Sequence, residues 1–527
     1  MSNANVDDLL AGIIKSFLKL QQENQTATLS EAVDAPKDTL EAEAESERQC
    51  QSHSKSKSKY TEAYYDKIAD DYIDFTYGNP TIYHVVDHFR RQLERNGFTY
   101  KSEKESWLDL KPGKYVTTRN GSSLSAFVVG EDWAPEKGVG AVGSHIDALT
   151  TVLKPNSTKQ KVDGYELLGV APYGGTLNEL WFDRDLAVGG RLLIKNSKGK
   201  ITQALVDSSP NPIAHIPTLA PHFGLSGVNL NKETKAVPVI GFSTEEDPTP
   251  TDAEKKAPLF GRHPLKLLRY IANLAKVNVE DISQWDLQLY DVQKGVRGGI
   301  NRDFVFAPRI DDRICSFAAV NALIDASKDG LLAKDSFSIV SLYDNEEVGS
   351  LTRAGAKGGI LELVVERVLA SEFFNPDAVG IQDALRLAYA NSIILSADVN
   401  HLLNPNFQEV YLEHHKPVPN TGVAIALDPN GHMATDSIGL ALVESLAKQN
   451  DDTLQYFQIR NDSRSGGTIG PSISSQTGAR TIDLGIPQLS MHSIRATVGA
   501  KDIGLGTKFF TGFYKNWRKT YDDYVDL

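Results

Sequence analysis

The chain contains 527 residues, of which 41% are hydrophobic and 23% are charged, and this length is enough for two or three domains. Lys and Arg total 55 against 68 Asp and Glu, and the formal charge of −13 argues against nucleic acid as a partner, because nucleic-acid binding requires a basic face. The only two cysteines, Cys50 and Cys315, cannot build a disulfide framework or a cysteine zinc site, so any metal must be held by His and carboxylates.

The N-terminal segment predicts an amphipathic helix on a polar tether. Residues 6–20 place apolar side chains at helical spacing, with polar residues largely on the opposite face. Residues 21–58 are rich in Gln, Glu, Ser, Ala and Lys, a composition that cannot bury a core. An ordinary surface helix is one interpretation. The tether favours an interaction element that joins like helices, enters a receptor groove or touches a membrane.

The N-terminus does not resemble a membrane anchor or a secretory signal. No apolar run approaches the roughly 18–20 residues that cross a bilayer. Asp7 and Asp8 stand where a secretory signal carries basic residues. Any route into a lumen must therefore use another mechanism.

Globular sequence begins near Tyr60 and changes character twice. Residues 60–98 predict helices that break at Gly78–Pro80, and strands are expected at 124–129 and 138–144. Residues 150–300 carry many Gly, Pro and short β-like runs, which indicates an inserted β-rich domain.

From about Phe304 the pattern alternates between helices and strands. Such alternation predicts an α/β fold with a mostly parallel sheet that is covered on both faces. The expected helices cover residues 314–326, 351–370, 380–391 and 436–449, and the expected strands cover 337–344, 392–398, 423–428 and 454–459.

Several candidate metal ligands directly follow strand-like runs, where α/β folds place their sites. His145 ends the run GVGAVGSH, and Asp147 two residues later can accept a hydrogen bond from its imidazole. Asp398 ends SIILSAD. An H-x-D pair is also common as a purely structural polar pair.

Asp311 and Asp312 stand at the mouth of a predicted helix, where Asp also serves as an ordinary cap. Three carboxylates, those of Asp344, Glu346 and Glu347, lie within four positions at the end of a strand-like run. Like charges this close require a cation or a shared proton, although a solvated acidic turn is the alternative. Adjacent side chains point in different directions, so one Glu can ligate metal while its neighbour acts as general base.

His492 adds a second imidazole, although a buried structural His is the commoner reading of such a residue. Two His and at least three carboxylates without Cys suit a pair of divalent ions such as zinc, about 3.5–4 Å apart.

The chain resembles the aspartyl aminopeptidase and vacuolar aminopeptidase I family of co-catalytic zinc metallopeptidases along essentially its whole length. It is more similar to the fungal vacuolar aminopeptidase I branch than to the cytosolic aspartyl branch. The segments that carry the resemblance include APYGGTLNELWFDRD at 171–185, IPTLAPHFG at 216–224, FAPRIDDR at 306–313 and NDSRSGGTIGP at 461–471.

The resemblance implies two Zn²⁺ ions per subunit and a role for each candidate residue. Glu346 would be the general base, and Asp147 would orient His145. The implied metal ligands are His145, Asp311 as the bridging carboxylate, Glu347, Asp398 and His492.

The family architecture implies a catalytic domain of mixed or parallel sheet at 60–147 and 307–527, with an inserted β-rich dimerisation domain at 148–306. Twelve subunits would form a homo-oligomeric shell. His222 resembles a His that the family extends toward a neighbouring subunit's active site.

Substrate preference is predicted from Ala426. Acid-selective relatives carry a Lys at this position, and without a cation an acidic side chain would be desolvated with no partner. Peptides with neutral, apolar N-terminal residues such as leucine are therefore the expected substrates. The alternatives are an aspartyl-selective aminopeptidase, a related carboxypeptidase or deacylase, or an assembly or cargo particle with weak activity.

The family also implies a role for the N-terminus. Residues 1–58 match the design of a propeptide whose helix, at residues 1–20, is recognised by a selective-autophagy receptor. The protein would be synthesised in the cytoplasm and mature in the vacuole lumen.

Overall fold

The computed structural model describes residues 59–224, 231–330, 332–375 and 380–524. The predicted propeptide helix and tether at residues 1–58 lie outside the described residues. None of the helices in the described ranges has the length and apolar character that a membrane span requires.

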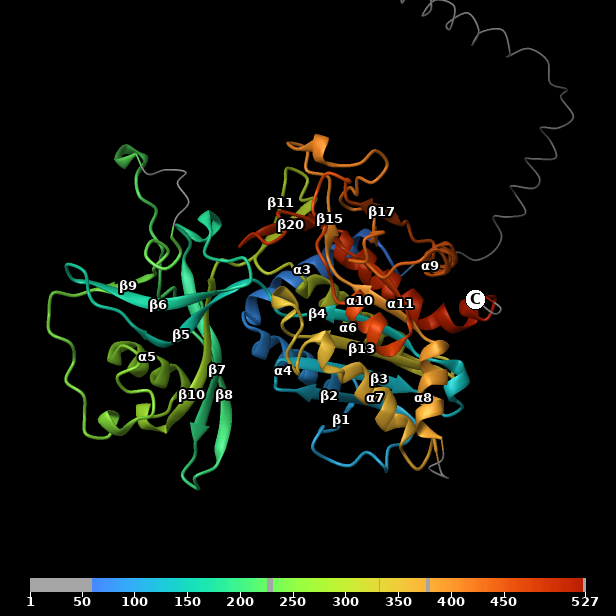
Figure 1. The fold of residues 1–527 in the computed structure, drawn as a ribbon, viewed down its shortest axis with the longest axis horizontal. Coiled ribbons are helices and arrows are strands. Elements are labelled where there is room, and N and C mark those ends of the chain that lie inside the picture. The colour runs from blue at the N-terminus through green and yellow to red at the C-terminus, as the bar shows by residue number, and fades with distance from the viewer. Residues whose placement is uncertain (1–58, 225–230, 331, 376–379, 525–527) are drawn as a thin grey trace, which may run out of the picture. The chain divides into compact units, whose positions relative to one another are not determined.

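A nine-stranded mixed sheet organises the part of the chain that carries the candidate ligands (Figure 1). Its order is β1-β2-β3-β13-β4-β14-β18-β16-β17, and the neighbours β13, β4, β14 and β18 run parallel. The strands are β1 (Thr99–Tyr100), β2 (Gly113–Arg119), β3 (Ser123–Val129), β4 (Gly140–His145), β13 (Phe337–Tyr343), β14 (Ile393–Ala397), β16 (Ala424–Leu427), β17 (Gln455–Gln458) and β18 (Arg480–Gly485).

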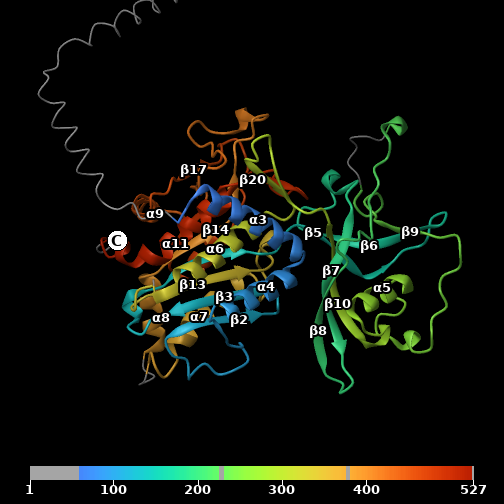
Figure 2. The same cartoon turned by 180° about the vertical axis from the view of Figure 1, so that it is seen from behind.

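Helices cover both faces of this sheet (Figures 1 and 2). Alternate residues of a strand point to opposite faces, so Val340 packs with the first helix layer and Ile339 with the second. Both layers are apolar, which explains the nearly continuous hydrophobic runs of the central strands. The first layer contains α3 (Glu62–Gly78), α4 (Ile82–Arg95), α6 (Arg313–Ala326), α9 (Ser437–Asn450) and α11 (Asp502–Tyr521), and the second contains α7 (Ile360–Leu369), α8 (Ile381–Ala390) and α10 (Gly470–Thr477).

The predicted α/β alternation is confirmed, with one partial error. The helix expected at 351–370 begins only at Ile360, because residues 351–359 form turns and the short 3-10 helix Ala356–Gly358. A Cβ added at Gly355 would lie 2.6 Å from the carbonyl oxygen of Ser350, so the chain folds back too tightly there for helix.

A second, antiparallel sheet of six strands follows the order β8-β7-β10-β5-β6-β9 and has a hydrophobic core of its own, to which α5 (Leu265–Ala275) contributes. Antiparallel pairing matches the β-rich character predicted for residues 150–300. The strands are β5 (Thr150–Thr158), β6 (Tyr165–Tyr173), β7 (Leu186–Lys195), β8 (Ile201–Asp207), β9 (Val239–Phe242) and β10 (Ile282–Asp291).

A third sheet of five short strands has the order β11-β12-β20-β19-β15. It joins the segment after β10 to the segment that carries His492, since β12 pairs with β20. The strands are β11 (Val296–Gly298), β12 (Phe304–Ala307), β15 (Asn400–His401), β19 (Pro487–Leu489) and β20 (Ala496–Gly499).

Candidate metal centre

The candidate ligands meet where the central parallel strands end. β4 and β13 are paired in register up to His145 and Tyr343, and β14 runs parallel to β4 on its other side. Because parallel strands end at the same edge of a sheet, the segments that follow them lie side by side. His145, the acidic turn after β13 and Asp398 are therefore brought together, as the sequence predicted.

His145 lies at the centre of the cluster and is almost fully buried. Its Nε2 lies 3.2 Å from Oδ1 of Asp311 and 3.5 Å from Oδ1 of Asp398. Its Nδ1 lies 3.1 Å from the carbonyl oxygen of Asp147 and 3.3 Å from Oδ1 of the same residue. Burial opposes protonation, but the Asp398 charge and the neighbouring carboxylates raise the pKa of His145 well above its ordinary value.

Asp311 is the carboxylate that approaches both imidazoles. Its Oδ1 faces His145, and its Oδ2 lies 3.6 Å from Nε2 of His492. The side chain of His492 is 59% exposed, in contrast to 1% for His145. The two histidines thus lie on opposite oxygens of one carboxylate.

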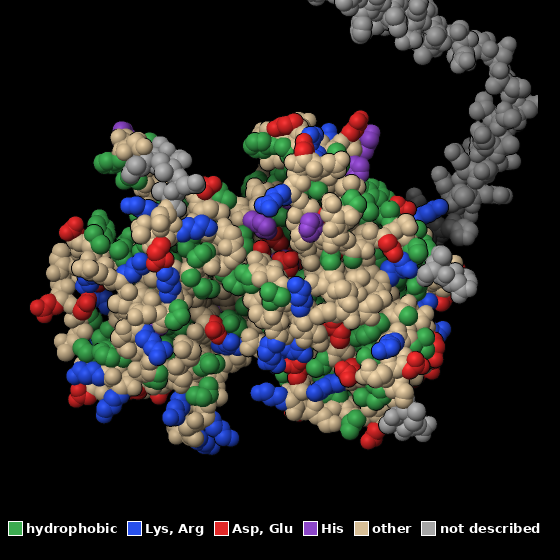
Figure 3. Space-filling view, viewed as in Figure 1, with side chains coloured by type: hydrophobic (Ala, Val, Ile, Leu, Met, Phe, Trp, Pro, Cys, Tyr) green, Lys and Arg blue, Asp and Glu red, His purple; other side chains and the backbone are tan. Residues whose placement is uncertain are grey.

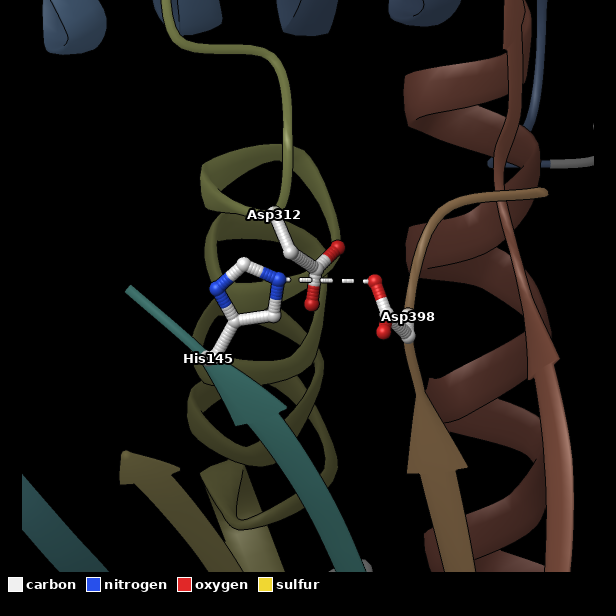
Figure 4. A group of neighbouring side chains, drawn as sticks. All are labelled: His145, Asp312 and Asp398. Atoms are coloured by element: carbon white, nitrogen blue, oxygen red, sulfur yellow. Dashed lines mark ion pairs between the residues drawn. The ribbon is translucent and has the colours of Figure 1, made fainter. Parts of the chain in front are cut away.

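Asp312 also enters the cluster, although the sequence prediction assigned it no ligand role. It is fully buried, accepts a 2.6 Å hydrogen bond from Oγ of Ser144, and lies beside His145 and Asp398 (Figure 4). Burial and the Asp398 charge raise the pKa of Asp312 well above its usual range. Its position just before α6 is compatible with a cap, but its side chain makes no capping hydrogen bond.

Glu346 and Glu347 occupy a 3-10 turn directly after β13. Their backbone N–H groups donate to the two carboxylate oxygens of Asp147, at 3.1 Å to Oδ1 and 3.2 Å to Oδ2. Glu346 Oε2 lies 3.9 Å from Nε2 of His145, and Glu347 Oε2 lies 3.6 Å from Nε2 of His492. Adjacent glutamates therefore point to different imidazoles. Asp147 holds the backbone of both.

The two glutamates lie in a buried, acidic environment that disfavours their ionised forms. Burial, together with nearby carboxylates, raises the pKa of Glu346 to about 8 and that of Glu347 to about 10. Carboxylates crowded out of water favour a bound cation or protons.

The donor set fits divalent metal ions. His145 forms one compact group with Asp312 and Asp398, and a second with Asp311 and Glu347, with ligand atoms within 4.8 Å of one another in each group. Among the described residues, Oδ2 of Asp311 and Oε1 of Glu347 are buried without a hydrogen-bond partner. Imidazole nitrogens and carboxylate oxygens are ligands that zinc prefers when Cys is absent.

A cavity opens beside the cluster and contains Ala426. Acidic and histidine side chains gather around a hollow on the face shown in Figure 3. Among the described residues that line the cavity there is no Lys or Arg. Its apolar lining includes Ala426, Leu427, Met433, Phe457, Ile459 and Met491.

His222 does not belong to this group within the described chain. It is exposed in the 3-10 turn Pro221–Phe223 and is not among the residues that line the cavity.

Three hydrogen bonds around the site are not predicted by the sequence analysis. Thr468 donates to Asp398 at 2.7 Å, and Tyr173 donates to Asp147 and accepts from Asn345. Tyr173 and Thr468 lie in motifs of the family resemblance, the only sequence signal that could have found them.

This donor set on a mixed α/β sheet is typical of co-catalytic metallopeptidases. Residues 75–514 match the family of the aminopeptidase I zinc metalloproteases (M18). Over 475 residues the chain is 59% identical to vacuolar aminopeptidase 1 of Saccharomyces cerevisiae, an alignment that covers 88% of this chain and 91% of that protein.

Solved structures agree with this relationship. A crystal structure of prApe1 is 60% identical, covers 87% of this chain and 97% of that chain, and superposes with a TM-score of 0.84. The S. cerevisiae mApe1 dodecamer is 56% identical, covers 88% and 100% of the two chains, and gives a TM-score of 0.79. The chain therefore belongs to the aminopeptidase I zinc metalloprotease (M18) family. It is accordingly a zinc-dependent aminopeptidase, a hydrolase of peptides.

Proposed function

We propose that this aminopeptidase uses a two-zinc centre to release neutral, apolar N-terminal residues such as leucine from peptides. The observation that carries the metal assignment is the position of Asp311 between two imidazoles, with Oδ1 toward His145 and Oδ2 toward His492. A carboxylate in this position suits a bridging ligand. The proposed ligands are His145, Asp311, Glu347, Asp398 and His492.

The chain's own residues supply the proton transfers and the positioning. Zinc held by these ligands would supply a Lewis acid that polarises the scissile carbonyl. Glu346 would take a proton from the attacking water and pass it to the leaving amine, as a general base and then a general acid. Asp147 would orient His145 and hold the Glu346 backbone through its 3.1 Å hydrogen bond.

Selectivity for apolar residues follows from the cavity. Ala426 lies on β16 at its wall, and the described lining offers no Lys or Arg to pair with an acidic substrate side chain. Desolvating an unpaired carboxylate there costs several kcal/mol, by an order-of-magnitude estimate. A leucine-like side chain instead gains contact with Phe457 and Met491.

Kinetics on matched peptides test this proposal. The enzyme is expected to hydrolyse a leucyl peptide faster than an aspartyl peptide, to leave an N-acetylated peptide intact, and to lose activity to a chelator.

Ala426→Lys should raise the ratio of aspartyl to leucyl kcat/KM by about 100-fold, since the lysine offers a cation to the substrate carboxylate. Faster aspartyl hydrolysis by the natural enzyme would establish the aspartyl-selective alternative. Cleavage of the blocked peptide would indicate a carboxypeptidase or deacylase.

The assembly is proposed to follow the family pattern. We propose residues 148–306 as a dimerisation domain within a dodecamer. The match to the mApe1 dodecamer and the separate core of the six-stranded sheet support this. Exposed His222 would reach a neighbouring subunit's site. Light scattering should give twelve subunits. His222→Ala should lower activity without changing that number. A fully active monomer would contradict both the proposed dodecamer and the proposed role of His222.

The N-terminus is proposed to be a propeptide that directs delivery. Similarity to vacuolar aminopeptidase 1 and to prApe1 supports a zymogen made in the cytoplasm and matured in the vacuole lumen. Residues 1–20 would bind a selective-autophagy receptor. Deleting them should leave peptidase activity but abolish delivery, whereas normal delivery of the deletion would refute the assignment. A delivered particle without chelator-sensitive turnover would establish the cargo alternative.

A further inference from the structure

Tyr173 connects the six-stranded sheet to the candidate metal centre. It is the last residue of β6, and its pairing with Thr150 of β5 places it beside the segment that follows His145. Its hydroxyl donates to Oδ2 of Asp147 at 2.7 Å and accepts from Nδ2 of Asn345 at 2.9 Å. Thr352 in turn donates to Oδ1 of Asn345 at 2.6 Å, which orients the amide.

Asp147 is the point at which this chain of hydrogen bonds reaches the site. Its side chain is only 4% exposed, so donors within the protein rather than water must satisfy its oxygens. Its carboxylate receives the backbone N–H groups of Glu346 and Glu347 and faces Nδ1 of His145. The Tyr173 hydroxyl is the donor that the six-stranded sheet adds to this carboxylate.

We propose that Tyr173 is a positioning residue, which fixes Asp147 and thereby sets His145, Glu346 and Glu347 in the geometry that binds zinc and transfers the proton. The inference rests on the proposed roles of those residues. It gives the six-stranded sheet a function inside its own subunit, in addition to any role in assembly. Without the hydroxyl, Asp147 loses a charge-assisted hydrogen bond and Asn345 loses its acceptor.

Tyr173→Phe in the full-length protein tests the proposal because it removes only the hydroxyl. We expect zinc affinity, measured by competition with a chromogenic chelator, to fall about tenfold, and kcat to fall by a similar factor. KM should remain nearly unchanged, because Tyr173 does not line the cavity that contains Ala426. Asn345→Ala removes the donor that orients the hydroxyl, so it should lower zinc affinity and kcat by smaller factors. It serves as the test if Tyr173→Phe fails to fold.

Tyr514→Phe is the matched control, since the Tyr514 hydroxyl donates to the carbonyl of Ile339 in the sheet core. It should lower Tm while zinc affinity and kcat stay at the natural level. A Tyr173→Phe enzyme with natural zinc affinity and kcat, whatever its Tm, would overturn the proposal. Failure of the natural enzyme to bind zinc would instead refute the proposed metal centre.

Discussion

The two ends of the metal centre are built differently. His145 ends a central strand, is 1% exposed, and is surrounded by Asp147, Asp311 and Asp398. His492 lies on a turn after β19, is 59% exposed, and has a left-handed backbone with φ of 62°. The buried end is organised by the sheet and the exposed end by a loop. We therefore expect substitutions at the buried end to have the larger effects.

The largest expected effect comes from the proposed general base. Glu346→Gln should lower kcat by about 10³-fold while zinc content stays normal, because the amide keeps the shape but cannot accept the proton. Turnover of a leucyl peptide and metal analysis would measure the two quantities. Glu444→Gln is the control, since Glu444 accepts a hydrogen bond from Tyr456 on the surface and its substitution should be silent. Activity within tenfold of the natural enzyme would exclude Glu346 as the base.

The contrast between the two histidines is tested directly by their alanine variants. His145→Ala should weaken zinc binding by at least about 100-fold, because it removes an imidazole ligand at a buried position that water does not readily fill. His492→Ala should weaken it by about tenfold, because water can reach the exposed position. Chelator competition measures both, with His215→Ala as the control, since this half-buried His lies on the six-stranded sheet's side of the chain in an ion pair with Asp183. Equal losses would show that burial does not distinguish the two ends.

A smaller effect on zinc affinity is expected from removal of the hydrogen bond that supports Asp398. Thr468 donates to Oδ2 of Asp398 at 2.7 Å, so Thr468→Val should lower zinc affinity by about fivefold to tenfold, at the low end of such outer contacts. Thr511→Val, which removes a hydroxyl bond within α11, should leave zinc affinity unchanged. If both variants behave alike, the Thr468 contact only stabilises the fold.

Much of the fold could be predicted from local pattern. The central strands are continuous apolar runs because both sheet faces are buried, and the residues after them could be named as candidate ligands. Hydrophobic periodicity does not predict the start of α7, because the turns before it depend on tight backbone approaches around Gly355. Sequence spacing cannot tell which of Asp311 and Asp312 contacts the second imidazole. That contact depends on the path of the distant loop that carries His492.

Residue types and periodicity are enough to predict the type of site, with imidazoles and carboxylates that follow strand-like runs. Selection against acidic substrates at Ala426 stays a prediction. The folded chain brings to one carboxylate, that of Asp147, the N–H groups of both glutamates and the hydroxyl of Tyr173. Strand periodicity is a property of neighbouring residues. These hydrogen bonds join groups up to 200 positions apart, and only the packing of separate segments brings them within reach.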